Sequence, residues 1–321
     1  MPEAAAPASI ARPDGWQVLK RNRVALISLG FLAALTLITI VVPLLLPEAL
    51  KLTSSESFVP PSKAHLLGTD VNGQDMLYRL LSGARVSLGV GLVGALISLG
   101  IGTLYGMISG YAGGRIDGFM MRTVEVLQSV PRILFIMILI AALDEYVKGW
   151  IDGWRLAAEQ SDRLEFAKVM NELKAYTKVL VMIISLGLVE WLTMARIVRG
   201  QVLVLREMTF VTASRAMGQS SWQVLRRHLL PNLSTIILTY LTLTIPAVIL
   251  DESFLSFLGL GIEDPASSWG SLLKDGAQVI NPLESKWWLL VFPALLMSVS
   301  LLALNFLGDG LRDAFDPKGG E

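Results

Sequence analysis

The chain has 321 residues, of which 53% are hydrophobic and 17% are charged, and its formal net charge is zero. Soluble domains are about 25% charged, so this composition indicates a membrane protein, and we expect no nucleic-acid partner. Disulfides, thiolate metal sites and a thiol nucleophile are excluded because the chain contains no cysteine. The two histidines, His65 and His228, lie far apart in different kinds of segment, so we expect no metal site.

Long, mostly uncharged runs predict six membrane-spanning helices, since a bilayer core requires about 20 helical residues. The first span covers residues 24–46 and follows an N-terminal tail, residues 1–23. It is too long for the apolar core of a signal peptide, and no small-residue cleavage pattern follows it, so we expect an uncleaved anchor. The remaining spans are predicted at residues 86–114, 117–143, 179–195, 233–250 and 287–307.

The segments around the later spans differ in composition. Residues 47–85 are polar, and Pro60 and Pro61 exclude a continuous helix there. The core of the protein, residues 86–307, begins with a glycine-rich span, which predicts close packing against neighbouring helices. Residues 144–174 interrupt this core with a hydrophilic stretch of seven acids and five bases, whose apolar positions are loosely helical.

Positive charges concentrate on one side of this predicted topology. Six spans put both termini, the turn at residues 113–122 and the loop at residues 196–228 on the same side. The positive-inside rule therefore predicts that this side is cytoplasmic, together with the short C-terminal tail at residues 308–321. Residues 47–85 and 144–174 then lie outside.

The most informative stretch runs from Thr209 to Pro231, between the fourth and fifth predicted spans. Its first half predicts a helix that Gly218 ends, since glycine readily adopts the left-handed conformation. Ser220 can cap a second helix, and Gln223 three residues later completes the capping-box spacing. Pro231 is predicted to end this second helix, because proline lacks an amide donor and restricts the residue before it.

The second helix of this stretch is amphipathic. Trp222, Leu225 and Leu229 share one face, and Arg226 lies at its side. The surrounding residues, 196–227, carry six arginines and a single acid. Two interpretations are open: a helix–turn–helix whose apolar face enters a groove of a partner, or a helix pair held on the lipid surface by its basic charge.

Four further stretches of the chain carry recognisable motifs. They are LLGTDVNGQD at 66–75 with GARVSLGVG at 83–91, ARIVRGQVL at 195–203, SFLGLG at 256–261 with SSWGSLL at 267–273, and GDGLRDAFDP at 308–317. With these motifs the chain resembles the C-type permease (transmembrane) subunit of the oligopeptide/dipeptide/nickel ABC importer family. The resemblance covers most of the sequence, except that residues 144–174 look like an insertion relative to typical members.

The stretch at 209–231 is similar to the cytoplasmic EAA loop of that family. The matching positions are Ala213, Gly218, Leu230 and Pro231. Three positions depart from the family pattern: Thr212 stands where the family favours Glu, Ser214 where it favours Ala, and His228 where it favours Ile.

The resemblance implies an all-α membrane protein with the type I ABC importer permease fold, six transmembrane helices and a cytoplasmic EAA coupling helix. It implies a multi-pass protein of a bacterial or archaeal cytoplasmic (inner) membrane, with both termini in the cytoplasm. The implied partners are a homologous second permease subunit, two ABC ATPase subunits and an extracytoplasmic substrate-binding protein, besides membrane lipid.

The chain is expected to be a subunit of a translocase and not itself an enzyme. It contains no GxxxxGK[ST] phosphate loop, so ATP and Mg would be bound by the partner ATPase subunits, and no cofactor is expected in this chain. Oligopeptides or dipeptides are the implied cargo. Nickel chelates or oligosaccharides are the alternative within the same importer class, and a secondary transporter is a more distant one.

The resemblance also implies which residues meet the ATPase. Trp222 and Leu225 are the expected apolar anchors, and Gly218 sets the angle between the two helices. Acids inside spans are candidates for contact with the substrate in the pore, because burying charge in lipid is costly; these are Glu190 and Glu252. The alternative is that Glu190 pairs with Arg196 or another helix and that Glu252 sits at the membrane edge. The complete expected docking set is Ala213, Gly218, Ser220, Trp222, Leu225, Arg226, Leu230 and Pro231.

Overall fold

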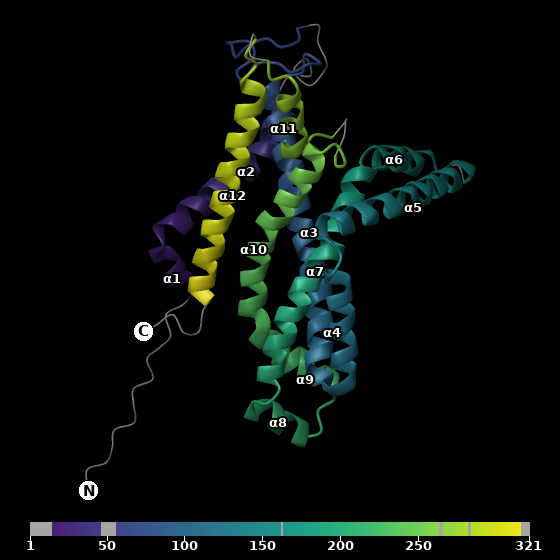
Figure 1. Ribbon diagram of the computed structural model, residues 1–321, viewed down its shortest axis with the longest axis vertical. Coiled ribbons are helices and arrows are strands. Elements are labelled where there is room, and N and C mark those ends of the chain that lie inside the picture. Colours follow the sequence, from purple (N-terminus) through teal and green to yellow (C-terminus); the bar gives the residue numbers. More distant parts are fainter. Residues whose placement is uncertain (1–14, 46–55, 162, 263–265, 282–283, 316–321) are drawn as a thin grey trace.

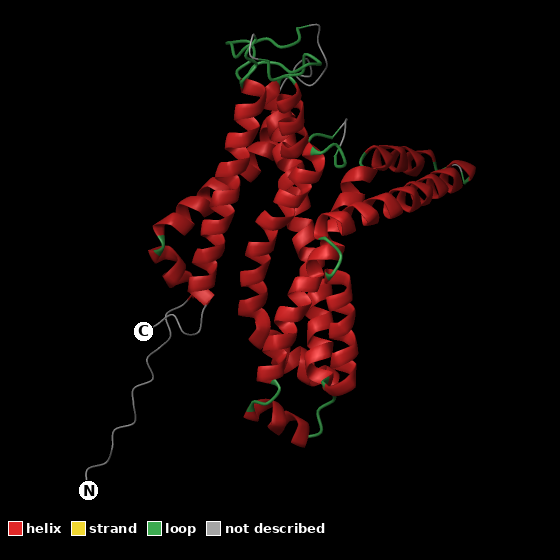
Figure 2. Ribbon diagram, viewed as in Figure 1, coloured by secondary structure: helices red, strands yellow, loops and turns green. Residues whose placement is uncertain are grey.

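The computed structural model describes residues 15–45, 56–161, 163–262, 266–281 and 284–315. Within these residues the chain is almost entirely helical, as Figures 1 and 2 show, and its single β-bridge joins Thr69 and Asp75. The helices are α1 (Gly15–Arg21), α2 (Arg23–Leu45), α3 (Met76–Ala112), α4 (Gly114–Gln128), α5 (Arg132–Gln160), α6 (Leu164–Ala175), α7 (Thr177–Leu205), α8 (Thr209–Ala216), α9 (Ser221–Val224), α10 (Leu230–Phe257), α11 (Trp269–Gln278) and α12 (Trp288–Phe315), and a π-helical turn at Leu225–Leu229 joins α9 to α10.

Membrane-spanning helices form the body of the protein. In the described residues, α4 and α5 make a sixth candidate span only if the two helices are counted together, and they are bent by 91° at the break between them. The prediction of one continuous helix over residues 117–143 is therefore wrong. Pro131 accounts for the break, because it lacks an amide donor and restricts the residue before it. The five helices that are long and apolar enough to cross a membrane by themselves are Arg23–Pro43, Met76–Ala112, Thr177–Leu205, Ser221–Phe257 and Trp288–Ala314.

Close packing of α3 against α7 forms the centre of the bundle. Three glycines spaced one turn apart on α3, Gly102, Gly106 and Gly110, face the backbone or Cβ atoms of α7. A Cβ added at Gly106 would lie 2.4 Å from the carbonyl oxygen of Ala195, which no side chain tolerates. The expectation that the glycine-rich span is packed inside a bundle is confirmed.

Leucine at position 106 is expected to force these two helices apart. The contact is with backbone, so the clash cannot be relieved by a side-chain rotation, and overpacking of this kind costs about 1–3 kcal/mol or more. We expect Gly106→Leu to lower the thermal unfolding temperature of the detergent-solubilised protein. Gly100→Leu is the matched control, because a Cβ at Gly100 on the same helix meets no atom within 4 Å. Equal losses in both variants would contradict the packing argument.

Helices α5 and α6 form a hairpin that projects from the side of the bundle (Figure 1). It contains the stretch at residues 144–174, so the loosely helical pattern predicted there is confirmed. An ion pair between Lys174 and Asp152, 2.9 Å long, ties the two helices together. Large aromatic side chains on α5 remain exposed, including Trp150 and Trp154.

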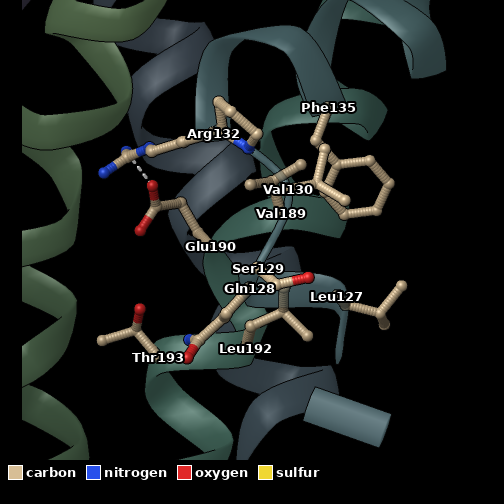
Figure 3. Close-up of a pocket in the computed structure, with 11 residues that line it drawn as sticks. Leu127, Gln128, Ser129, Val130, Arg132, Phe135, Val189, Glu190, Leu192 and Thr193 are labelled. Atoms are coloured by element: carbon tan, nitrogen blue, oxygen red, sulfur yellow. Dashed lines mark hydrogen bonds and ion pairs between the residues drawn. The ribbon is translucent and has the colours of Figure 1, made fainter. Parts of the chain in front are cut away.

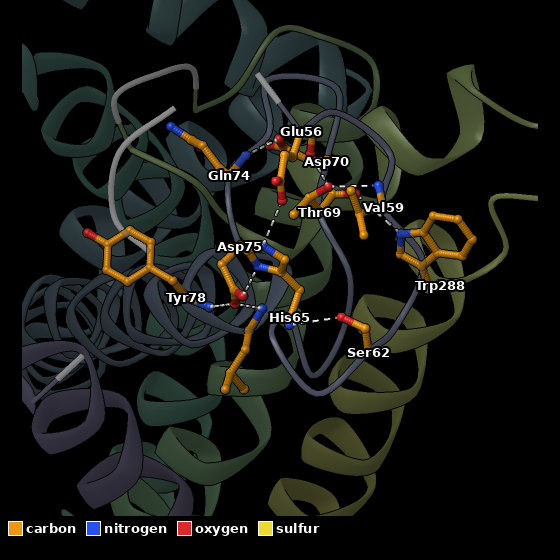
Figure 4. Close-up of polar contacts among 11 residues, drawn as sticks. Glu56, Val59, Ser62, His65, Thr69, Asp70, Gln74, Asp75, Tyr78 and Trp288 are labelled. Carbon is orange, nitrogen blue, oxygen red and sulfur yellow. Dashed lines mark hydrogen bonds and ion pairs between the residues drawn. The ribbon is translucent and has the colours of Figure 1, made fainter. Parts of the chain in front are cut away.

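Residues 56–75 form a polar cap over one end of the bundle, shown in Figure 4. The carboxylate of Asp75 accepts hydrogen bonds from the first amides of α3 and contacts His65 Nδ1 at 2.9 Å. Asp70 accepts from Arg79 Nη1 at 2.6 Å. The indole of Trp288 donates to the Thr69 carbonyl at 3.3 Å, which joins the cap to α12. The α8 and α9 helices lie at the opposite end of the bundle (Figure 1).

Candidate functional site

The α8–α9 loop, defined here as Thr209–Leu229, folds as the predicted pair of short helices. Gly218 has a φ of 80° and sits between them, so the helix stop predicted there is confirmed. The amide of Gln223 donates to Ser220 Oγ at 3.4 Å, and the amide of Ser220 donates to Gln223 Oε1 at 2.9 Å. The predicted capping box is therefore present.

The second helix does not end at Pro231, so that part of the prediction is wrong. The chain stays helical from Ser221 to Phe257, through the π-helical turn at Leu225–Leu229 and into α10. The amide of Leu230 bonds to the carbonyl of Leu225, five residues back. This wider turn precedes Pro231 and accommodates it, because proline cannot donate the amide hydrogen bond that a regular helix needs at that position. The α8–α9 loop is thus continuous with a membrane-spanning helix.

Trp222 and Leu225 point in different directions, although both were expected to face a partner. The Trp222 side chain is 58% exposed, whereas Leu225 is 6% exposed and packs with Val198 and Val202 of α7. Leu225 therefore anchors the loop to its own bundle and offers no surface to another protein. The rest of the expected docking set is exposed: Ala213, Gly218, Ser220, Trp222, Arg226, Leu230 and Pro231.

A polar cross-link that the sequence did not suggest joins α8 to the π-helical turn. His228 Nε2 lies 3.2 Å from Ser214 Oγ and 3.0 Å from Gln219 Oε1. Ser214 Oγ donates its own hydrogen to the Phe210 carbonyl at 2.7 Å, and Gln219 Oε1 can only accept, so we assign a hydrogen to His228 Nε2 that these two oxygens share. Ser214 and His228 are two of the positions that depart from the family pattern. The two side chains are in contact, and two departures from the family pattern in one short loop are a signal that could have suggested this contact.

One ion pair and two further hydrogen bonds hold the helices together at this end of the bundle. Arg199 on α7 donates to Asp117 on α4 at 2.9 Å, and Ser109 on α3 donates to the same carboxylate at 2.6 Å. Arg206, at the end of α7, donates to the Gly110 carbonyl on α3 at 2.9 Å. The α8–α9 loop therefore extends from a corner where three helices are held by charge-assisted hydrogen bonds.

A second candidate site lies at the break between α4 and α5. Arg132, the first residue of α5, contacts the carboxylates of Glu190 on α7 and Asp251 on α10. We call these three residues the Arg132 cluster. Glu190 thus pairs with another helix, as one alternative predicted. Its expected partner Arg196 instead contacts Gln128 at the end of α4.

A cavity of about 350 Å³ adjoins the Arg132 cluster (Figure 3). Its wall combines the broken segment with one face of α7, and both Arg132 and Glu190 line it. Arg132 and Asp251 were not singled out from the sequence, although Arg132 is a charge within a predicted span and Asp251 directly follows another. The lining residues are Leu127, Gln128, Ser129, Val130, Pro131, Arg132, Phe135, Val189, Glu190, Leu192 and Thr193.

Glu252 lies apart from this cavity and is fully buried. Its carboxylate accepts hydrogen bonds from Ser256 at 2.7 Å, Ser87 at 3.1 Å and Ser253 at 3.2 Å. Because Glu252 has no exposed surface, its carboxylate offers nothing to a substrate in this structure, and its position at the membrane edge stays a prediction. Glu252 instead joins α10 to α3 inside the protein.

Comparison with known proteins places the chain in a family. Residues 102–319 match the family described as binding-protein-dependent transport system inner membrane component. Residues 13–61 match the N-terminal transmembrane domain of oligopeptide transport permease C.

Two curated relatives and one solved structure illustrate the similarity. The dipeptide transport system permease protein DppC of Bacillus subtilis is 39% identical over 317 residues, covering 97% of this chain and 88% of the relative. The oligopeptide transport system permease protein OppC of Escherichia coli K12 is 40% identical over 310 residues, covering 94% and 91%. An inward-facing structure of the MetNI methionine ABC transporter has a TM-score of 0.51 at 18% identity and covers 75% of this chain and 98% of that chain, which shows a shared fold.

Proposed function

Because the chain belongs to the family of binding-protein-dependent transport system inner membrane components, within its oligopeptide and dipeptide ABC permeases, we propose that it forms half of a pore for peptide import. The other half would be a homologous permease subunit. Two ATPase subunits would bind ATP and Mg, and an ATPase subunit would dock against the α8–α9 loop of this chain. An extracytoplasmic binding protein would deliver the peptide. The protein would lie in the inner membrane with both termini in the cytoplasm.

The exposure of Trp222 on a helix continuous with a span is the observation that carries this proposal. A large aromatic side chain that is 58% exposed has little to gain from water, and such residues commonly dominate the energy of an interface. The neighbouring arginines, Arg226 and Arg227, add positive charge beside it. A partner that binds Trp222 would act directly on α10, because no loop separates the two.

Purification of the chain from native membranes in mild detergent tests the proposal. We expect a second permease subunit and ATPase subunits to be recovered with it and identified by mass spectrometry. Uptake of peptide by the reconstituted complex should require ATP and the binding protein. Uptake of nickel chelates or oligosaccharides in place of peptides would change the assigned cargo and keep the importer. Uptake without any ATPase would overturn the proposal in favour of a secondary transporter.

Gly218 is expected to set the angle at which the α8–α9 loop meets the ATPase. Valine at a φ of 80° costs about 1–2 kcal/mol, whereas the space around Gly218 is open, so the effect of Gly218→Val acts through the backbone. We expect this variant to assemble and hydrolyse ATP while peptide uptake falls. Intact uptake with intact assembly would show that the angle is not important.

Two further variants serve as controls for this prediction. Gly218→Asn should retain most uptake, because asparagine tolerates the left-handed conformation better than valine. Gly114→Val introduces the same strain at a φ of 55°, also in open space, but at the junction of α3 and α4. It should lose comparable stability and keep hydrolysis coupled to uptake.

A further inference from the structure

The Arg132 cluster already holds one cation, the guanidinium of Arg132 itself. The two carboxylates reach it from different helices, Glu190 from α7 and Asp251 from α10. The carboxylates are largely covered, with 10% and 18% of their side chains exposed, whereas the Arg132 side chain is 45% exposed. The cluster therefore binds a positive charge, and its accessible side is the side on which the Arg132 side chain lies.

The charges within the cluster do not balance. Two carboxylates face one guanidinium, which leaves one formal negative charge among helices that cross the membrane. The N-terminus of α5 adds only about half a positive charge, so the cluster is negative when both carboxylates are ionised. Arg132 and Glu190 are the formally charged residues among those described as lining the cavity. A second cation arriving from the cavity would make the cluster neutral.

The cavity beside the cluster has room for such a group. Its volume of about 350 Å³ falls within the usual range of ligand pockets, about 300–1,000 Å³. Transporters commonly bind their cargo where a membrane helix is discontinuous, and here α4 and α5 are interrupted at the cavity wall. Polar side chains of Gln128 and Thr193 also face this space (Figure 3).

We propose that the Arg132 cluster is a specificity-determining site in the translocation path, where the surplus carboxylate binds a positively charged amino group of the transported molecule. This inference rests on the proposed function. A peptide with a free amino terminus carries such a group, and the same peptide with an acetylated terminus lacks it. When no cargo is present, the positive charge of Arg132 lowers the energetic cost of holding two carboxylates within the membrane. The incoming ammonium then neutralises the remaining negative charge.

The test compares uptake of one peptide in two forms, with a free and with an acetylated amino terminus, by the complete reconstituted importer. Any discrimination by the binding protein between the two peptides is the same for every permease variant. We expect Asp251→Asn and Glu190→Gln each to lower the ratio of free-terminus to acetylated uptake about tenfold or more, because one partner of a covered charge pair is removed.

Two controls separate the inference from simple loss of structure. Glu165→Gln removes an exposed acid of the α5–α6 hairpin and should leave the ratio unchanged. The double variant Arg132→Glu with Glu190→Arg retains the net charge of the cluster and should restore the ratio towards that of the wild type.

Equal losses for both peptides in Asp251→Asn and Glu190→Gln would overturn the inference, since the cluster would then only hold helices together. An unchanged ratio in both variants would overturn it as well. In either case ATP-driven peptide uptake by the wild type would leave the proposed function standing. Absence of that uptake would be the separate failure of the proposed function.

Discussion

Replacement of Trp222 with Asp is expected to remove the ATPase subunits from the purified complex and to lower ATP-driven uptake about a hundredfold. Buried aromatic anchors at interfaces are commonly worth about 2 kcal/mol or more, and the variant also places an unpaired charge in the contact. Trp222 makes little contact within its own chain, so folding of the protein should be unaffected. The measurement is co-purification in mild detergent, followed by uptake into proteoliposomes.

The chain offers a matched control for this variant. Trp154 is also a helical tryptophan, 61% exposed against 58% for Trp222. It lies on α5, in the hairpin that projects from the side of the bundle, away from the α8–α9 loop (Figure 1). Trp154→Asp should retain the ATPase subunits. Trp222→Phe keeps an aromatic ring and should retain part of the binding. ATPase recovery from Trp222→Asp at the wild-type level would show that the partner docks elsewhere.

Removal of the Glu252 side chain is expected to cause the largest loss of stability. Its carboxylate serves three serine hydroxyls, and two of these serines hold further backbone: Ser87 Oγ accepts from the Trp269 amide and Ser256 Oγ from the Ile262 amide, each at 3.1 Å. Glu252→Ala would leave buried hydroxyls without an acceptor in an emptied space. Each such group costs about 1–3 kcal/mol, so we expect a total loss of roughly 3 kcal/mol or more.

Replacement of Glu252 with glutamine distinguishes the contribution of its hydrogen bonds to the serines from the contribution of its negative charge. Glu252→Gln preserves the shape and one acceptor oxygen, so we expect a clearly smaller fall in the thermal unfolding temperature than for Glu252→Ala. Glu284→Ala, which removes an exposed acid, serves as the surface control. If all three variants unfolded at the wild-type temperature, the serine network would have no role in stability.

Local features of the fold were predictable, and those that depend on distant segments were not. The capping box at Ser220 and the stop at Gly218 depend on a few neighbouring residues, so their spacing was sufficient. Hydropathy located the spans, but it carries no geometry, and Pro131 was therefore placed inside a helix that the structure breaks. The effect of Pro231 was overestimated because a π-helical turn absorbs its missing hydrogen bond.

The candidate site shows the same limit more sharply. Helical periodicity put Trp222 and Leu225 on one face, but only the position of α7 decides that Leu225 is covered and Trp222 is not. Arg132 and Asp251 are 119 residues apart, and nothing in the residues near either one indicates that they meet. A buried acid such as Glu252 can equally be a substrate ligand or the centre of a hydrogen-bonded network, and its neighbours in space determine which.

The uninterrupted helix from Ser221 to Phe257 has a mechanical consequence. Trp222 and Asp251 lie on the same rod, separated by 29 residues, or roughly 43 Å at about 1.5 Å per residue. Two places on this rod depart from regular α-helical hydrogen bonding, the turn at Leu225–Leu229 and the interior proline Pro246. The helix is therefore a long rigid element that can bend at these two places. A sideways displacement of Trp222 would therefore shift Asp251 relative to Arg132, reduced by any bending at those two places.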